Sequence, residues 1–189
     1  MVSELAPGFL VASPSLTDPN FKRSVVLLID HRPEGSLGFV VNRPAQNVTF
    51  RGVVDELGLT PEGYPPPNLP VMVGGPVQPH TGWIVFDPST AAGTDTDSIK
   101  VNDKLRVSAS RDFLRDVARE RSVSRHLLIL GYAGWGAGQL DQEIRQGAWI
   151  PVDVTESILF ETPWDDRWKG ALAALGIEPA HLVGQISQA

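Results

Sequence analysis

The sequence predicts an α+β fold in which one domain contains a mixed β-sheet with helices packed against it. Several short runs of consecutive apolar residues, of which 25–29 is the clearest, are typical of strands that are buried on both faces. Segments in which apolar residues have helical spacing, such as 110–121, alternate with these runs. The chain has 189 residues, a length that suits one domain with its own core.

Each strand is predicted from an apolar or alternating run with turn residues at its ends. Segment 31–36 has a turn composition, so the runs on either side of it are predicted to form a hairpin or a close strand pair. Segments 99–101 and 105–108 alternate polar and apolar residues, which is typical of strands with one face in water. The other predicted strands are 8–12, 24–30, 37–42, 71–73, 82–87 and 126–130, followed by short apolar segments at 149–154 and 158–160.

Four helices are predicted, and the last is the best marked. Thr162 suits its N-cap, Pro163 its first turn and Asp165 the acidic position of a capping box. Each of the other three contains apolar residues spaced along one side. The predicted helices are 49–59, 110–121, 139–147 and 162–176.

Residues 1–189 are interpreted as one domain, with an exposed proline-rich loop at 61–70 and a tail at 178–189. The sequence contains no cysteine, which excludes disulfides, thiolate metal sites and cysteine nucleophiles. Its N-terminus does not resemble a signal peptide, and its longest apolar stretch, 127–138, is too short to span a membrane. A cytoplasmic protein is therefore expected.

The charge distribution argues against nucleic-acid binding. The formal net charge is −6, although the segment 100–125 contains eight basic and four acidic residues. Several of these acids lie three residues from a base on the predicted helix 110–121, so much of the positive charge is compensated locally. DNA affinity depends on uncompensated Lys and Arg, and the rest of the chain repels a duplex. The basic segment is therefore interpreted as a solvated helix face.

Metal binding and serine catalysis have weak support in the sequence. The chain has no HxxxH or HExxH pair, so no metal site and no cofactor are predicted. It also lacks the G-x-S-x-G nucleophile motif. A Ser-His-Asp set assembled by the fold stays open, because such sets are recognised by geometry and not by sequence order. The four histidines are His31, His80, His126 and His181.

The glycine-rich segment 131–138 is the sharpest local feature. A buried strand, a glycine turn and a helix N-terminus in that order bind phosphate in many folds through backbone N–H groups. The spacing Gly134-x-Gly136-x-Gly138 is nevertheless neither the dinucleotide fingerprint nor a Walker A loop. One hypothesis is an anion-binding loop. The alternative, which we favour, is a tight strand-to-helix turn with Trp135 packed in the core.

Several ordered segments together resemble the bacterial YqgE/AlgH family. One of them is Gly35-x-x-Gly38 followed by hydrophobic residues and Asn42-Arg43-Pro44. The resemblance extends over about residues 5–177 and leaves out 61–70 and 178–189. The segments that carry it are 8–14, 18–25, 35–44, 74–76 and 131–143, followed by Trp149, Trp168 and Gly176.

The resemblance implies a single α+β domain with a bifurcated, partly barrel-like sheet surrounded by helices. It implies little about activity, because the family is essentially uncharacterised biochemically and no catalytic residues are attached to it. One branch has been proposed to regulate exopolysaccharide synthesis, and members are often labelled transcriptional regulators. That label agrees poorly with the charge of this chain.

Together, these features predict a non-enzymatic regulatory or adaptor protein that binds a small anionic ligand or a protein partner. Polar residues of the matching segments suit the lining of one pocket, although turn capping and core hydrogen bonding explain them equally well. The candidate ligand-binding residues are Asn42, Arg43, Gly74, Gly75, Gly134, Gly136, Gly138, Gln139 and Glu143.

Two other classes of function remain open. The first is an enzyme that acts on a small substrate, with Asp18, His31 or Glu143 as general acid or base. It requires two titratable groups within hydrogen-bond reach of one cleft. The second is direct DNA binding, which predicts an affinity that falls steeply with salt.

Overall fold

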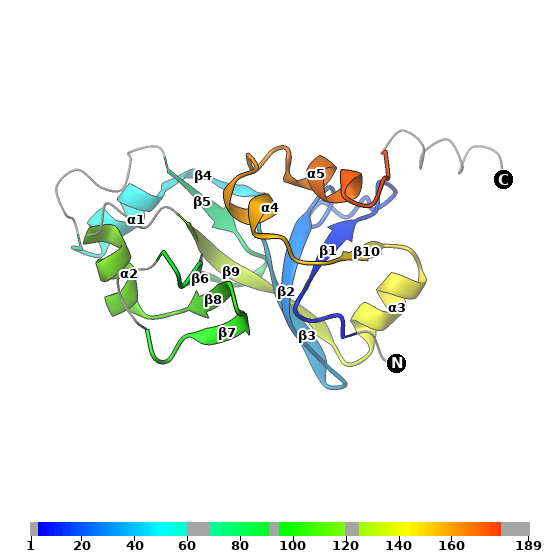
Figure 1. Cartoon of the computed structure of the whole chain (residues 1–189), viewed down its shortest axis with the longest axis horizontal. Coiled ribbons are helices and arrows are strands. Elements are labelled where there is room, and N and C mark those ends of the chain that lie inside the picture. Colours follow the sequence, from blue (N-terminus) through cyan, green and yellow to red (C-terminus); the bar gives the residue numbers. More distant parts are fainter. Residues whose placement is uncertain (1–3, 60–68, 91–94, 120–124, 179–189) are drawn as a thin grey trace.

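The apolar runs of the sequence become strands of one large sheet in the computed structural model, which describes residues 4–59, 69–90, 95–119 and 125–178. Ten strands and five helices lie within these residues (Figure 1). In chain order they are β1 (Gly8–Ala12), β2 (Val25–Arg32), β3 (Gly35–Val40), β4 (Pro44–Thr49), α1 (Phe50–Glu56), β5 (Pro70–Val73), β6 (Val77–Phe86), β7 (Ile99–Asn102), β8 (Leu105–Ser108), α2 (Arg111–Arg119), β9 (His126–Gly136), α3 (Gln139–Arg145), β10 (Trp149–Val152), α4 (Glu156–Phe160) and α5 (Arg167–Ala173).

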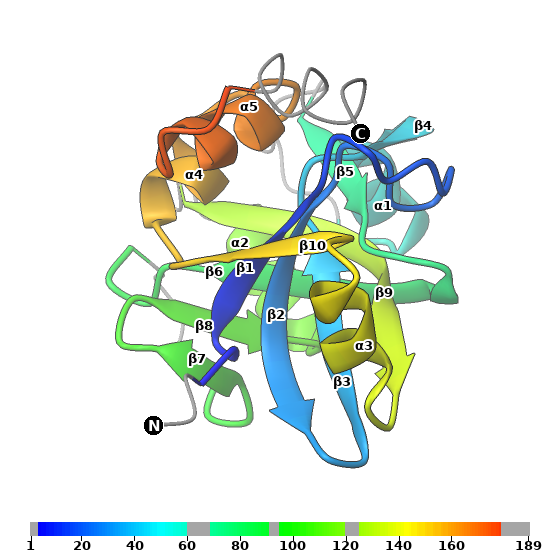
Figure 2. The same cartoon turned by 90° about the vertical axis from the view of Figure 1, so that its right-hand side faces the viewer.

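β9 is the central strand and the point at which the sheet divides. The main path runs β10-β1-β2-β3-β9-β6-β8-β7, and β5, which pairs with β4, joins β9 in parallel at Ile129 and Leu130. The second part of β9, from Ala133 to Gly136, pairs instead with β3. The sheet curls into a half-barrel with helices around it (Figure 2), which confirms the predicted α+β class and bifurcated sheet.

Both faces of the first strands are buried, as the continuous apolar runs predict. Side chains alternate between faces along a strand, so Phe9 and Val11 pack in the core on the concave face while Leu10 packs on the opposite face. β2 follows the same rule, since Leu27 packs with the first core and Val26 with the second. A strand covered on both faces needs no polar side chain, which explains why these runs lack alternation.

Three groups of helices provide this cover. α4 and α5 bring Leu159, Trp168 and Leu172 onto the concave face. α1 and α2 pack over the outer face of β5, β6 and β9, where Phe50 and Phe113 join one core. α3 covers the outer face of β1, β2 and β3 together with Trp135 and Trp149. None of the helices in the described part of the chain is long and apolar enough to cross a membrane.

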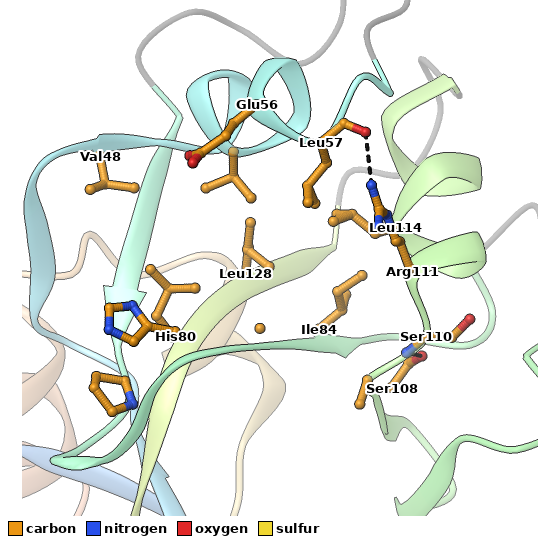
Figure 3. A pocket seen from close by; sticks show the side chains of 15 residues that line it. Val48, Glu56, Leu57, His80, Ile84, Ser108, Ser110, Arg111, Leu114 and Leu128 are labelled. Atoms are coloured by element: carbon orange, nitrogen blue, oxygen red, sulfur yellow. Dashed lines mark hydrogen bonds between the residues drawn. The ribbon is translucent and has the colours of Figure 1, made fainter.

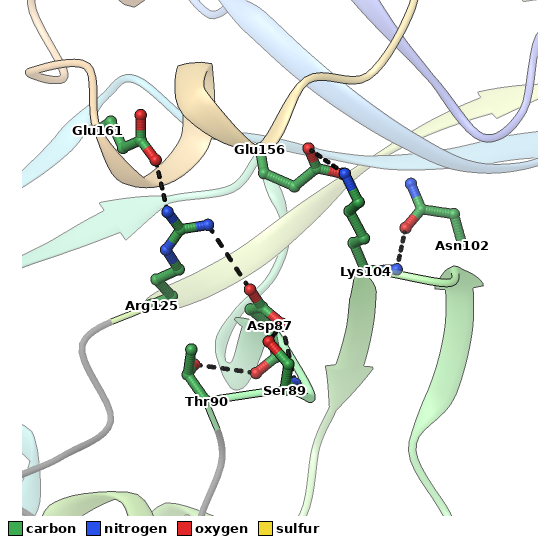
Figure 4. A network of polar contacts seen from close by, with 8 residues as sticks. All are labelled: Asp87, Ser89, Thr90, Asn102, Lys104, Arg125, Glu156 and Glu161. Carbon is green, nitrogen blue, oxygen red and sulfur yellow. Dashed lines mark hydrogen bonds and ion pairs between the residues drawn. The ribbon is translucent and has the colours of Figure 1, made fainter.

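A polar network ties α4 to the far half of the sheet (Figure 4). Arg125, just before β9, lies 3.7 Å from the carboxylate of Asp87 and 2.5 Å from that of Glu161. Lys104, in the turn between β7 and β8, lies 3.7 Å from Glu156 at the start of α4. These ion pairs connect segments that are far apart in sequence across the concave face.

Several predicted element boundaries were wrong. The last helix begins at Arg167 with Asp166 as its N-cap, because Pro163–Asp166 form a turn and not the first helical residues. Residues 158–160 are part of α4, and the strand predicted at 82–87 begins already at Val77. Pro70 starts β5, whereas the rest of the predicted loop, up to residue 68, and the tail from 179 onward lie outside the described residues.

Candidate functional site

Asn42 and Arg43 follow β3 and hold the loop that joins β1 to β2. The Asn42 side chain accepts a hydrogen bond from the amide of Val25 at 2.8 Å and donates one to the carbonyl of Arg23 at 2.9 Å. The Arg43 guanidinium donates to the carbonyls of Asn20 and Lys22. Two of the predicted polar residues therefore fix the backbone that carries Lys22 and Arg23.

Arg23 has a backbone conformation that few bulky residues adopt. Its φ is +54°, in the left-handed region that is costly for a side chain with a Cβ. Strain of this kind persists only where the surroundings enforce it, and it concentrates at functional sites. Here Asn42 holds the backbone on both sides, and the Arg23 guanidinium lies 5.7 Å from the centre of the Trp168 ring.

This loop, the end of β3 and the start of α5 enclose an open cavity of about 360 Å³, here called the basic pocket. Four cationic side chains surround it, and no carboxylate in the described part of the chain forms an ion pair with any of them. Trp164 is 40% exposed beside them. The lining residues are Lys22, Arg23, Asn42, Arg43, Pro44, Trp164, Asp165, Trp168 and Lys169.

A fifth cation lies buried beside the pocket. Arg167 is 6% exposed and donates hydrogen bonds to the carbonyls of Thr162 and Val41. Burial lowers the pKa of Arg167 to about 10, so the guanidinium remains charged at neutral pH. It joins the start of α5 to the residue before Asn42, which fixes the two sides of the basic pocket relative to each other.

Gly74 and Gly75 lie next to this region, and close packing of the backbone requires glycine at both positions. Gly74 accepts a hydrogen bond from the amide of Val40 and donates one to the carbonyl of Leu130. A Cβ on Gly74 would lie 2.4 Å from the carbonyl oxygen of Gly131, and one on Gly75 would lie 2.3 Å from the backbone of Tyr132. The two glycines are thus required by the close crossing of this turn over β9. Arg43 and Gly75 also line a cavity of about 80 Å³.

The predicted glycine loop is a strand, which corrects the strand–turn–helix interpretation. β9 continues through Gly134 to Gly136, pairs with the first part of β3, and leaves only residues 137 and 138 before α3. The amide of Gly136 donates to the side chain of Gln139 at 3.0 Å. Gly138 has φ +69°, which suits the turn before the helix. These residues lie away from Asn42 and Arg43, which follow the other end of β3.

Glu143 connects two tryptophans. Its carboxylate accepts hydrogen bonds from the indole N–H of Trp135 at 3.0 Å and of Trp149 at 2.8 Å, and a third from the Gln139 amide at 2.9 Å. Phe21, from the same loop as Lys22, packs against both indole rings. Glu143 is thus used in hydrogen bonding to two buried indoles, and Gln139, which is exposed, accepts from the amide of Gly136 in the turn before α3. These are the roles that the sequence left open as the alternative to a pocket, and Trp135 is buried as expected.

The residues predicted for acid–base chemistry do not share one cleft. Asp18 lies in the loop before β2, where it accepts from the amide of Asn20, while His31 lies at the opposite end of β2. His31 Nδ1 is 2.7 Å from the Ser36 hydroxyl, and its Nε2 is 3.4 Å from Asp141. The fold therefore does align a serine, a histidine and a carboxylate. In the serine-protease triad, however, Nε2 faces the serine and Nδ1 faces the carboxylate, and here the two nitrogens have the opposite partners.

The largest cavity that we describe was not anticipated from the sequence. It is a cleft of about 460 Å³ between α1, α2 and the outer face of β6 and β9 (Figure 3), here called the apolar cleft. The sequence indicated its aliphatic residues only as core, and Arg111 only as part of a solvated helix face. A glycine in the middle of the strand, Gly82, was the one signal of open space. Its lining residues are Val48, Val53, Glu56, Leu57, Pro79, His80, Gly82, Ile84, Ser108, Ala109, Ser110, Arg111, Leu114, Leu128 and Leu130.

Comparison with known proteins gives a consistent family. The model of the AlgH-like family matches residues 9–180. A UPF0301 protein of Anaeromyxobacter dehalogenans is 42% identical over 184 residues, covering 95% of this chain and 93% of the relative. The UPF0301 protein YqgE of Escherichia fergusonii is 38% identical over 173 residues, covering 90% and 91%.

Solved structures agree with the sequence relatives. The solution structure of the AlgH protein from Pseudomonas aeruginosa matches with a TM-score of 0.75 and 32% identity, covering 97% of this chain and 95% of that one. The crystal structure of protein DIP2367 from Corynebacterium diphtheriae matches with a TM-score of 0.70 and 24% identity, covering 89% and 86%. At that identity the second match supports the fold alone.

Proposed function

The chain belongs to the AlgH-like family, and we propose that it is a non-enzymatic, cytoplasmic regulatory or adaptor protein that binds a small anionic ligand in the basic pocket. One observation carries the proposal. Lys22, Arg23, Arg43 and Lys169 surround one opening, without partner carboxylates in the described part of the chain, although the whole protein has a formal net charge of −6.

Electrostatics favours an anion at this place. The cationic residues that line the basic pocket outnumber its one acidic residue, Asp165, by four to one. Such an excess of positive charge focuses the field in a cavity and raises the local concentration of anionic ligands. Four cations held close together repel one another, so a bound anion relieves a cost that the empty pocket carries. Asn42 and Arg43 support this arrangement, because they hold the backbone of Lys22 and Arg23 in position.

The exposed indole indicates the chemistry of the ligand beyond its charge. Trp164 offers a flat apolar surface beside the cations, and 40% of it is accessible. Phosphate oxygens suit Arg and Lys donors, and a planar ring suits stacking on an indole. We therefore place a phosphorylated molecule with a planar part in the basic pocket. The cavity volume, about 360 Å³, is in the range of small-molecule pockets.

The alternative of direct DNA binding has less support. Among the described residues of the segment 100–125, several cations are paired within the fold: Arg115 lies 2.6 Å from Asp112, and Lys100 lies 2.6 Å from Asp103. Arg125 contacts two carboxylates, and Arg106 donates to Ser98. Cations that are already paired release few counterions on a duplex, so they contribute little affinity.

The alternative of an enzyme rests on the alignment of Ser36, His31 and Asp141. These three residues lie at an exposed hairpin end, and the side chain of Asp141 is 44% exposed. His31 and Ser36 are cross-strand neighbours in the pairing of β2 with β3, so hairpin pairing alone explains their hydrogen bond. A Ser36→Ala variant that loses an esterase activity of the wild type would favour the enzyme.

Calorimetric titration tests the proposed function. We expect inorganic pyrophosphate and ATP to bind, ATP more tightly, and adenosine not to bind. Lys169→Gln and Lys22→Gln each lower the affinity about tenfold, the effect of losing about 1.4 kcal/mol of charge-assisted hydrogen bonding. Trp164→Ala brings ATP to the affinity of pyrophosphate, because only the stacking contact is removed.

Arg115→Gln is the matched control, since Arg115 is a cation on α2 outside the pocket. An equal loss of affinity in Arg115→Gln and Lys169→Gln would mean that anions bind through net charge alone, against the proposal. Absence of any anion binding, together with capture of an acidic protein that Lys169→Gln fails to capture, would replace the small ligand with a protein partner.

A further inference from the structure

The apolar cleft differs from the basic pocket in its place and in its chemistry. It lies between α1 and α2 on the outer face of the sheet, and its interior is aliphatic (Figure 3). Its volume of about 460 Å³ is in the range of pockets that bind small molecules, which are mostly apolar with few polar groups. The aliphatic residues around it are Val48, Val53, Leu57, Ile84, Leu114, Leu128 and Leu130.

Gly82 leaves open space in the lining of the cleft, at the point where β6 resumes regular pairing with β9 after a shift of register. Its φ is outside the left-handed region, and a Cβ would lie 3.8 Å from Leu128 Cδ1 and 3.9 Å from Leu130 Cδ2, which is ordinary contact. Glycine inside a strand reduces stability, because it has no side chain to pack and more backbone freedom to lose. Glycine inside a strand marks either a bulge or a close approach by a ligand or another backbone. Gly82 ends the irregular pairing of β6 with β9, and it also leaves the cleft open at this point.

The charged side chain that matters most in the cleft is Arg111. Arg111, at the start of α2, donates to the carbonyl of Leu57 at 3.0 Å, and no carboxylate of the described residues pairs with it. Glu56 and His80 lie apart from Arg111 in the close view (Figure 3). One side of the opening therefore offers a guanidinium to an anionic group. The rest of the lining is mainly apolar, and the hydroxyls of Ser108 and Ser110 are already used in hydrogen bonds to Asp95 and to the amide of Phe113.

From this arrangement we propose that the apolar cleft binds a small amphipathic monocarboxylate, with its hydrocarbon part over Gly82 and its carboxylate against Arg111. A chain of medium length fits the cavity, and each methylene removed from water contributes about 0.8 kcal/mol. The Arg111 side chain is already hydrogen-bonded to the carbonyl of Leu57. Ligand binding therefore costs less side-chain entropy than it would with a freely moving arginine. This ligand class and this site are independent of the anion proposed for the basic pocket.

The first test compares decanoate with decanol by calorimetric titration below the micellar range. We expect both to bind, and decanoate about tenfold more tightly. Arg111→Gln removes this difference, lowering the decanoate affinity to that of decanol and leaving decanol unchanged. Arg115→Gln, one turn along the same helix, is the control and retains the preference for the carboxylate. Equal binding of decanoate and decanol by the wild type would overturn the role of Arg111.

The second test fills the cleft. Gly82→Leu places a side chain in the open space, so we expect binding of both probes to fall at least thirtyfold while the thermal midpoint stays equal or rises. Val53→Trp, which fills the cleft from α1, tests the same point if Gly82→Leu fails to fold. Unchanged decanoate binding in either folded variant would overturn the site.

Lys169→Gln distinguishes the two proposals. It leaves decanoate binding unchanged if the cleft is a separate site, whatever its effect on pyrophosphate. A similar loss of decanoate binding in Lys169→Gln and Arg111→Gln would mean that decanoate responds to overall charge, and the proposed site would then be rejected.

Discussion

The side-chain amide of Asn42 donates a hydrogen bond to the carbonyl of Arg23, a residue whose backbone has φ +54°. The oxygen of the same side-chain amide accepts a hydrogen bond from the backbone amide of Val25, two residues after Arg23. Asn42 therefore fixes the backbone on both sides of Ser24, where the chain passes from the β1–β2 loop into β2. If the proposed basic pocket binds an anion, this contact holds Arg23 in place for it.

Replacing Asn42 with Ala is expected to reduce both stability and anion affinity. The amide of Val25 and the carbonyl of Arg23 lose their partners, which costs about 1 to 3 kcal/mol in the free energy of unfolding. Urea denaturation measures this loss, and titration with pyrophosphate measures the affinity. A destabilised variant with unchanged pyrophosphate affinity would show that the loop conformation does not matter for binding.

Replacing Glu143 with Leu is expected to destabilise the outer core. The indole N–H groups of Trp135 and Trp149 are then buried without acceptors, at a cost of about 3 kcal/mol. Glu143→Gln retains one carbonyl oxygen, so its loss is expected to be about 1 kcal/mol. Urea denaturation followed by tryptophan fluorescence distinguishes the two variants. Equal stability of both would mean that the carboxylate contributes little to holding the indoles.

Two glycine variants separate close packing from backbone conformation. Gly74→Ala brings a Cβ to within 2.4 Å of the Gly131 oxygen, so we expect a loss of about 3 kcal/mol or more. Gly138→Ala meets no atom within 4 Å and has only the cost of a positive φ, about 1 kcal/mol. Thermal unfolding of the two purified variants gives the comparison. The reverse order of stabilities would contradict the crossing of residues 74 and 131.

Two arginine variants compare an ion-pair network with a simple surface pair. Arg125→Ala leaves Asp87, which is 7% exposed, without its cation and detaches Glu161, so we expect a loss of about 1 to 2 kcal/mol. Arg115→Ala breaks only the surface pair with Asp112 and is expected to cost about 0.5 kcal/mol or less. Denaturation at low and high salt measures both losses, and similar values would show that the network has no special weight.

The strands that are buried on both faces were predictable, because a run such as Val25–Leu28 is apolar at every position. Such a run fits a strand that is covered on both sides. Helix α1 was also predictable, since Thr49 accepts from the amide of Gly52 as an N-cap should. The continuation of β9 through its glycines was not. Tertiary pairing with β3 overrides the turn preference of Gly134 and Gly136, and no local pattern reports a partner that lies about a hundred residues away.

The candidate site was predictable only in part. Arg43 and Gly75 line one small cavity, next in sequence to Asn42 and Gly74, whereas Gln139 and Glu143 are part of α3. Lys22, Lys169 and Trp164 complete the basic pocket from segments that only the fold brings together. Periodicity reveals which side of an element is apolar, but it contains no information on where two apolar sides fail to meet. Apart from Gly82, the sequence therefore contains no signal of the cleft between α1 and α2.

The pairing of the first strand with the last has a consequence for how the chain reaches its native state. Phe9 pairs with Val152, and β9 must be present before the two halves of the sheet can join. Contacts between such distant segments require closure of long loops, which slows folding. During synthesis β1 leaves the ribosome long before β10 exists, so its open edge waits unpaired. Completion of the sheet therefore waits until translation has passed β10, and until then one edge of β1 lacks its native partner.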